Sequence, residues 1–295
     1  MSDTPTADTD GRGVLYVPSA RELARRAKRK QIARRRAVVA TVSTALVLGA
    51  LLATIIFSPG WLVVKETFFD MNYARDVIGV VVRGLELNIL LTAIASVCIF
   101  GVALLLALMR TSQSAALTPL RILATTYVDI FRGVPLLLVI FLVGFGVPAL
   151  RLHGVTSSVT VLGTVAVIVT YSAYVAEVLR SGILSVHPSQ RAAARSLGLT
   201  QWQTTRYVVL PQALKRVVPP LLNDLVALMK DTGLVSILGV IDAIRAAQIE
   251  ASRSFNFTPY VVAAVFFLGI TIPLTRYTDR ILERSIARQN AQGPT

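Results

Sequence analysis

The chain has 295 residues, of which 54% are hydrophobic and 16% charged, and its formal net charge is +14. This apolar fraction excludes an ordinary soluble domain and predicts a membrane protein. An excess of Lys and Arg can indicate nucleic-acid binding, but here the basic residues border apolar runs, so we expect no nucleic acid as partner. The single cysteine, Cys98, leaves neither a disulfide within the chain nor a cysteine metal site.

Six apolar runs follow one another along the chain, each of roughly the 20 residues needed to cross a bilayer core about 30 Å thick. They cover residues 37–57, 85–109, 122–147, 158–179, 217–240 and 259–279. Pro, Gly or charged residues interrupt the third and fifth runs. We therefore expect an all-α polytopic membrane protein with six transmembrane helices.

The distribution of basic residues predicts how these spans are oriented. Nine of the sixteen residues from Arg21 to Arg36 are Lys or Arg, directly before the first apolar run. By the positive-inside rule this tail is cytoplasmic, and six crossings return the C terminus to the same side. We expect a multi-pass plasma (inner) membrane protein with both termini in the cytoplasm.

A cleaved signal peptide is the competing interpretation of residues 1–57. Its positive region is too long for one, its apolar run fills a bilayer and no A-x-A-like site follows, so we expect an uncleaved anchor. The expected segments are a basic cytoplasmic tail (1–36), an N-terminal transmembrane helix (37–57), an external connection (58–81), a transmembrane domain (82–284) and a cytoplasmic C-terminal tail (285–295).

A polar, basic loop at 181–216 separates two of the apolar runs. We predict that Ser189 caps a short helix ending near Leu197, with Gly198 in the left-handed position after it. The sequence from Thr200 to Gln203 fits a T-x-x-Q capping box, which would open a second short helix reaching Pro211. The residues alone leave two interpretations open: a knob that docks a water-soluble partner, or a loop lying on lipid headgroups.

Ionisable side chains also lie in or beside the predicted spans. Asp, Lys or Arg at a helix centre costs about 2.5–3.5 kcal/mol, so such groups should lie near the interfaces or face a polar interior. Spacing of three residues predicts that Asp129 pairs with Arg132 and Glu177 with Arg180. The bland interpretation is that these charges are inter-helix ion pairs and interface anchors.

The functional interpretation is a translocation path for a zwitterion. A substrate carboxylate would meet a cationic side chain and an ammonium an anionic one. The candidate path residues are Arg132, Glu177, Asn223, Lys230 and Asp231.

Motifs for other chemistry are missing from the sequence. It has no G-x-x-x-x-G-K-[ST] phosphate-binding loop, no H-E-x-x-H and no G-x-S-x-G. We expect no catalytic residues, no metal site and no cofactor in this chain. Any ATP and magnesium would be used by a partner.

From about Val82 to Arg284 the sequence resembles the permease subunits of ABC importers for polar amino acids, of the histidine/glutamine/glutamate type. The resemblance runs through several motifs in order: GLELNILLTAIASVCIFGVALLLALMR, FRGVPLLL, AYVAEVLRSGILSVHPSQ, AAARSLG, VVLPQALKRVVPPLLND and LMKDTGLVSILGV. It implies a type I ABC-importer permease core, here with one extra N-terminal helix.

The same resemblance implies that the polar loop is the coupling loop, gripped by a separate ATPase subunit. The positions carried over for ATPase coupling are Ala192, Ala193, Ala194, Gly198, Val208, Leu210 and Pro211. The implied partners are an ABC ATPase subunit, a second permease subunit, an extracellular substrate-binding protein, the amino acid and membrane lipid. A stand-alone secondary transporter or channel for a small polar solute is the alternative function.

Four positions depart from the family pattern. Ala192 replaces the usual Glu, Ser189 an often-found Gly, Val208 the usual Ile and Gly233 a common Ser. The lost Glu removes a potential charged contact to the ATPase.

Overall fold

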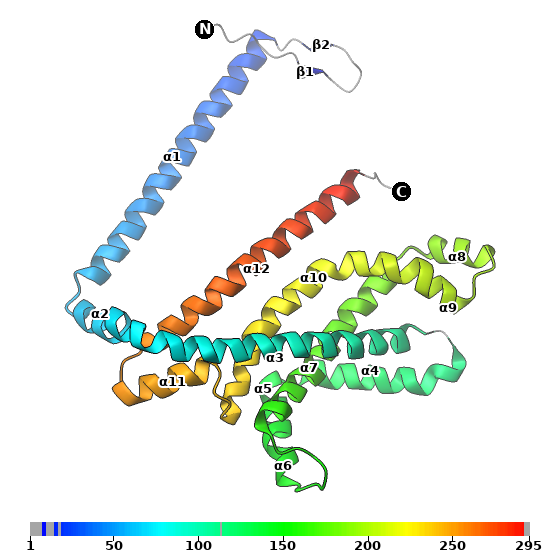
Figure 1. The fold of residues 1–295 in the computed structure, drawn as a ribbon. Coiled ribbons are helices and arrows are strands. Elements are labelled where there is room, and N and C mark those ends of the chain that lie inside the picture. Colours follow the sequence, from blue (N-terminus) through cyan, green and yellow to red (C-terminus); the bar gives the residue numbers. More distant parts are fainter. Residues whose placement is uncertain (1–7, 10–14, 17–18, 113, 292–295) are drawn as a thin grey trace. The chain divides into compact units, whose positions relative to one another are not determined.

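The computed structural model describes residues 8–9, 15–16, 19–112 and 114–291, and these are almost entirely helical (Figure 1). The chain divides into two compact units, Met1–Val64 and Lys65–Thr295. The all-α class expected from the sequence is confirmed.

The first unit contains a two-residue antiparallel ladder and one long helix. Strand β1 (Asp8–Thr9) pairs with β2 (Leu15–Tyr16), and helix α1 (Ala20–Ile56) follows. The Ser19 hydroxyl caps α1 by accepting a hydrogen bond from the backbone N–H of Glu22. The basic segment and the first predicted span are therefore one continuous helix, while residues 1–7, 10–14 and 17–18 of the predicted tail lie outside the described residues.

The remaining helices follow in chain order. They are α2 (Trp61–Phe68), α3 (Met71–Thr111), α4 (Thr118–Gly133), α5 (Leu136–Phe141), α6 (Val147–Ala149), α7 (Val159–Leu184), α8 (Pro188–Ser196), α9 (Gln201–Thr204), α10 (Leu210–Asp231), α11 (Ala243–Ser254) and α12 (Thr258–Ala291). The 3₁₀ turns η1 (Ala115–Leu117) and η4 (Thr232–Leu238) and the π-helical turns η2 (Leu142–Gly146) and η3 (Thr205–Val209) join some of them.

Within the described residues, four helical stretches are long and apolar enough to cross a membrane: α1, α2 with α3, α7 and α12. A bent pair, 115–133 with 136–149, adds a fifth if it is one span. The predicted run 217–240 corresponds to α10 and η4. It does not meet the same criterion, because α10 carries Lys215, Arg216, Asp224, Lys230 and Asp231. The multi-pass architecture is confirmed, and the count of six crossings stays a prediction.

The break in the third predicted span is a sharp bend of 105°. Pro135 has no backbone N–H, and its ring forces Val134 into an extended conformation (φ −95°, ψ 131°) that ends α4. The second span differs in length, because α3 begins at Met71 instead of near residue 85. Asp70 fixes that start by accepting hydrogen bonds from the N–H groups of Asn72 and Tyr73.

The second unit is built around α7, which packs against α3, α4, α5 and α10. Small side chains let the helices approach closely, as is usual between membrane helices. Six fully buried alanines lie in this contact region: Ala95, Ala103 and Ala107 on α3 with Ala166, Ala173 and Ala176 on α7. At the α7–α10 contact, a Cβ added to Gly182 would lie 2.2 Å from Val217 Cγ1. The core therefore depends on missing or minimal side chains.

A buried polar joint attaches α11 to α3. Asn88 on α3 donates a hydrogen bond to Asp242 Oδ2 at 3.0 Å and accepts one from the backbone N–H of Ala243 at 3.1 Å. One turn earlier on α3, Gly84 leaves room for this backbone, since a Cβ there would lie 2.4 Å from the Asp242 carbonyl carbon. The joint thus requires glycine at position 84.

We predict that Gly84→Ala destabilises the protein. The clash is with backbone that cannot rotate away, and overpacking of this kind costs about 1–3 kcal/mol. The melting temperature of the detergent-purified protein should fall by roughly 2–12 °C. Gly79→Ala on the same helix is the control, because nothing lies within 4 Å of its added Cβ. Equal melting temperatures for the two variants would contradict the joint described here.

Candidate functional site

The polar loop begins with α8, which follows directly from the end of α7. Its N-cap is His187, whose Nδ1 accepts a hydrogen bond from the backbone N–H of Ser189 at 3.2 Å. The prediction that Ser189 caps this helix is therefore wrong. Pro188 occupies the first turn of α8, where a backbone N–H has no partner within the helix, so its missing N–H costs no hydrogen bond. The cap is therefore His187, the residue before the proline.

The end of α8 is a Schellman motif, with Gly198 in the left-handed position predicted from the sequence. Gly198 has φ +84°, its N–H donates to the Arg195 carbonyl, and the N–H of Leu199 donates to the Ala194 carbonyl. The predicted capping box is also present, with Thr200 and Gln203 each bonding the other's backbone N–H. Local hydrogen bonds alone therefore define this turn.

The second helix of the loop does not end at Pro211, contrary to prediction. α9 continues through the π-helical turn η3 into α10, so Pro211 lies in the first turn of α10 instead of marking a stop. A proline in a helix lacks one donor, and a π turn beside it accommodates the missing bond. The loop is thus joined to α10, part of the fifth predicted span, by unbroken helix.

Two arginines fasten the loop to the end of α7. Arg191 on α8 donates from Nη2 to the Ile183 carbonyl oxygen at 2.5 Å. Arg216 on α10 donates from Nη1 to the carbonyl and the hydroxyl of Ser185. Both carbonyls lie at a helix C terminus, where cations are favoured. Arg191 therefore holds α8 against the end of α7, and Arg216 holds α10 against the same end.

The predicted coupling residues differ in exposure. Ala192, Ala193, Gly198 and Pro211 are exposed, Val208 and Leu210 are half-buried, and Ala194 is buried at 5%. Three large apolar side chains that the sequence analysis did not single out are also exposed here: Leu197 at 81%, Trp202 at 60% and Tyr207 at 65%. Large apolar residues within an otherwise polar, basic segment are the sequence signal that could have identified them.

The charged candidates separate into different places. Glu177 on α7 lies among three arginines: its carboxylate is 2.5 Å from Arg110 Nη1, 2.9 Å from Arg180 Nη1 and 3.8 Å from Arg132 Nη1. The predicted Glu177–Arg180 pair is confirmed. The predicted Asp129–Arg132 pair is wrong. Arg132 lies near the α7 carboxylate instead, and Asp129 has no ion pair among the described side chains.

The other path candidates, Asn223, Lys230 and Asp231, lie on α10. Asp231 accepts a hydrogen bond from the Tyr171 hydroxyl at 2.7 Å. Asn223 and Lys230 are exposed and make no side-chain hydrogen bond or ion pair within the part of the chain that the structure describes. The structure therefore brings Arg132 and Glu177 together and leaves the three later residues apart from them.

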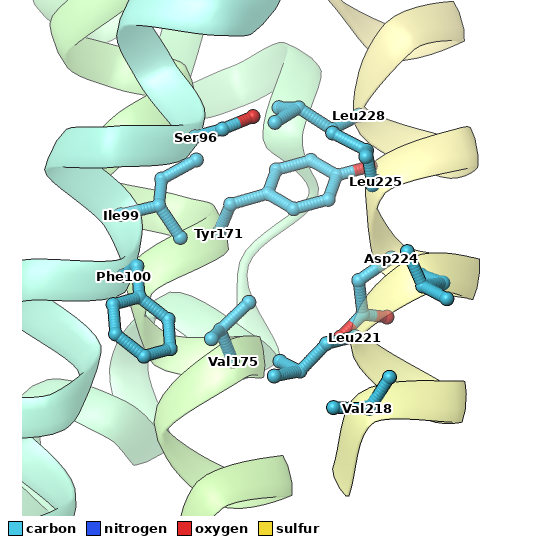
Figure 2. Close-up of a pocket in the computed structure, with 11 residues that line it drawn as sticks. Ser96, Ile99, Phe100, Tyr171, Val175, Val218, Leu221, Asp224, Leu225 and Leu228 are labelled. Carbon is cyan, nitrogen blue, oxygen red and sulfur yellow. The ribbon is translucent and has the colours of Figure 1, made fainter. Parts of the chain in front are cut away.

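A cavity of about 310 Å³ lies between α3, α7 and α10 (Figure 2). Its lining is apolar except for three side chains, Ser96, Tyr171 and Asp224. Figure 2 shows Tyr171 reaching from α7 toward α10 and Asp224 projecting from α10. The Oδ2 atom of Asp224 is buried and has no hydrogen-bond partner in the described chain. A buried carboxylate without a partner is costly, so this cavity is suited to a cationic group.

Asp224 is not among the path residues expected from the sequence, although it lies in the fifth predicted apolar run. Its neighbours Pro219 and Pro220, inside α10, interrupt the apolar run and were the available signal. Within the described residues no group of three His, Cys, Asp or Glu side chains could hold a metal ion.

We predict that Glu177→Gln lowers the stability of the protein. Three arginines would lose their shared counter-charge, and losing a charged hydrogen-bond partner costs about 1–3 kcal/mol. The thermal unfolding midpoint in detergent measures this, with Glu250→Gln as the control because Glu250 pairs with one exposed arginine, Arg253. An unchanged midpoint in Glu177→Gln would show that the cluster does not hold the helices together.

Comparison with known proteins places this geometry in a family. The model of the family described as "Binding-protein-dependent transport system inner membrane component" matches residues 114–288. Over 199 residues the chain is 38% identical to a Bacillus subtilis protein named probable glutamine ABC transporter permease protein GlnM, covering 65% of this chain and 88% of that protein.

Solved structures agree with the sequence match. A crystal structure of an amino acid ABC transporter with histidines is 31% identical, with a TM-score of 0.66, covering 73% of this chain and 98% of that one. The MetNI methionine ABC transporter in inward facing conformations shares the fold, at 22% identity and a TM-score of 0.53 over 70% of this chain and 96% of that one. The chain belongs to the family of binding-protein-dependent transport system inner membrane components.

Proposed function

We propose that this chain is a permease subunit of an ATP-driven importer of polar amino acids and that a separate ATPase subunit docks on α8. The observation that carries the proposal is the loop geometry: a short capped helix with exposed Ala192 and Ala193, fastened to α7 by Arg191. Similar proteins named as glutamine and amino acid ABC transporter permeases support the substrate class.

The proposed orientation puts both termini and α8 in the cytoplasm. The basic residues between Arg21 and Arg36 support this, because cytoplasmic flanks of membrane helices carry an excess of Lys and Arg. Arg180, Arg191, Arg195, Arg206, Lys215 and Arg216 in and around the loop follow the same rule. An ATPase that uses cytoplasmic ATP and magnesium would meet the loop on this side.

Motion of the ATPase would reach the membrane helices through rigid connections. α8 is tied to α7 by Arg191, and α9 runs without a break into α10. A push on α8 would therefore move the cytoplasmic ends of α7 and α10 together. Alternating access also requires a second permease subunit, identical or homologous, and an extracellular substrate-binding protein that delivers the amino acid.

The proposed coupling surface is the exposed side of α8 together with the turn that follows it. Ala192 and Ala193 leave a low profile that fits a groove, while Leu197 and Trp202 offer apolar area around it. Ala194 faces the permease, so its role would be to let α8 lie close to the bundle.

The path proposal combines the candidate charges with the cavity of Figure 2. An amino acid carries one ammonium and one carboxylate, and Asp224 offers an unpaired carboxylate for the first. Arg132, Asn223 and Lys230 do not line this cavity, so they are candidates for the carboxylate at other points of the path. Glu177 and Asp231 already have protein partners, which favours a supporting role for them.

Gly198→Val should uncouple the transporter without preventing membrane insertion. A β-branched residue strains the left-handed conformation by about 1–2 kcal/mol or more and displaces the turn after α8, so ATP-driven uptake in reconstituted vesicles should fall about tenfold. Gly198→Asn is the matched control, because Asn tolerates this conformation and should retain uptake. Uptake at full rate by Gly198→Val, or uptake without any ATPase subunit, would contradict the coupling proposal.

Asp224→Asn should impair transport while leaving the amount of protein unchanged. A charged hydrogen bond to a substrate ammonium contributes about 1.5–3 kcal/mol, so uptake at low substrate concentration should fall about tenfold. Asp129→Asn removes the same charge from an exposed side chain without an ion pair in the described chain and serves as the control. Equal uptake by both variants would remove Asp224 from the path.

A further inference from the structure

A second cavity, of about 380 Å³ and with a more polar lining than the first, lies where the ends of three helices meet. Arg110 comes from the last turn of α3, Arg121 from the first turns of α4 and Arg180 from near the end of α7. Ile122, Thr125 and Thr126 of α4 complete the lining, and none of the lining side chains is a carboxylate. Three guanidinium groups from three helices thus face one cavity.

The positive charge of this cavity is only partly compensated. Glu177 lies behind it and is shared by Arg110, Arg180 and Arg132, so one carboxylate faces three guanidinium groups. Among the described residues Arg121 bonds only neutral acceptors, the Ser112 carbonyl at 3.2 Å and the Thr118 hydroxyl at 3.4 Å. An anion would therefore gain favourable electrostatic energy in the cavity.

Free hydrogen-bond donors also line the cavity. Arg110 and Arg180 each use one terminal nitrogen on Glu177, and their other nitrogens have no acceptor among the described residues. The hydroxyls of Thr125 and Thr126 likewise make no hydrogen bond in the described part of the chain. Several guanidinium and hydroxyl donors around an open volume suit the oxygens of a phosphate group.

Apolar side chains flank the cavity on α4. Ile122 is 59% exposed and lines it, and its neighbour Leu123 is 65% exposed. In a membrane protein such side chains meet acyl chains, and helix ends lie at the depth of the headgroups. Basic pockets between transmembrane helices are known to take the headgroups of anionic lipids. A soluble phosphate has no acyl chains and would make no apolar contact with Ile122 and Leu123.

We propose that Arg110, Arg121 and Arg180, with Thr125 and Thr126, bind the phosphate of an anionic phospholipid. The lipid would bridge α3, α4 and α7 where α7 leads into α8, so it would stiffen the part of the bundle next to the loop. The site concerns lipid and not the transported solute. It therefore does not depend on the proposed function, and its test needs neither substrate nor ATPase.

The test uses the full-length chain purified in mild detergent, with bound phosphatidylglycerol measured by native mass spectrometry against added phosphatidylcholine. The wild-type chain should retain phosphatidylglycerol preferentially. Arg121→Gln, which leaves the bridges to Glu177 intact, should weaken retention about tenfold, the effect expected for one charged hydrogen bond. Thr125→Val with Thr126→Val should weaken it too, and this variant removes no hydrogen bond between described residues.

Arg253→Gln is the matched control, since it removes one positive charge from an exposed side chain outside the cavity. Equal retention by wild type, Arg121→Gln and the double threonine variant would overturn the proposal, as would equal loss in Arg253→Gln. Displacement of the lipid by millimolar inorganic phosphate would also overturn it, because the site would then recognise a soluble phosphate. Failure of this test leaves the proposed transport function untouched.

Discussion

The attachment of α8 to the end of α7 is the contact on which a coupling role depends. Arg191 reaches from α8 to the Ile183 carbonyl, and Arg216 reaches from α10 to Ser185. Charged donors on the free carbonyls of a helix end are among the stronger hydrogen bonds a protein makes. Without Arg191, α8 would lose its hydrogen bond to α7, and a partner pressing on α8 would transmit less of that force to α7.

The core of the second unit supports this attachment. Gly182 allows α10 to approach α7 near the same end, and alanines on α3 and α7 keep the bundle closely packed. Charges in the bundle are grouped: Glu177 is shared by three arginines from α3, α4 and α7, which offsets part of the cost of placing them in the bundle. Asp224 is the exception, a carboxylate left without a partner in a cavity.

Features set by neighbouring residues could be predicted from the sequence. Gly198 and the Thr200–Gln203 box act through hydrogen bonds within a few residues, and both were found as predicted. Features set by distant contacts could not. Arg110 and Glu177 pair although they are 67 positions apart in the sequence. Arg132 lies near the Glu177 carboxylate on another helix and not near Asp129, three residues before it on α4.

Proline was harder to interpret than glycine. Pro135 bends the chain by 105°, Pro211 lies after a π turn in continuous helix, and Pro219 and Pro220 remain inside α10. A missing N–H breaks a helix only when neighbouring segments do not restore the hydrogen bonding, which depends on tertiary packing. His187 as the cap of α8 was missed for a related reason, since a proline at the first turn moves the cap before it.

Site-specific cross-linking in native membranes tests the central claim most directly. Cys98 is the only cysteine, so Cys98→Ser provides a background for single-cysteine variants. In that background Ala193→Cys, on the exposed side of α8, should cross-link to an ATPase subunit, and Ala194→Cys, on the buried side, should not. If Ala193→Cys reacts only with a lipid-soluble reagent and never with an ATPase, α8 lies on the membrane and the account is contradicted.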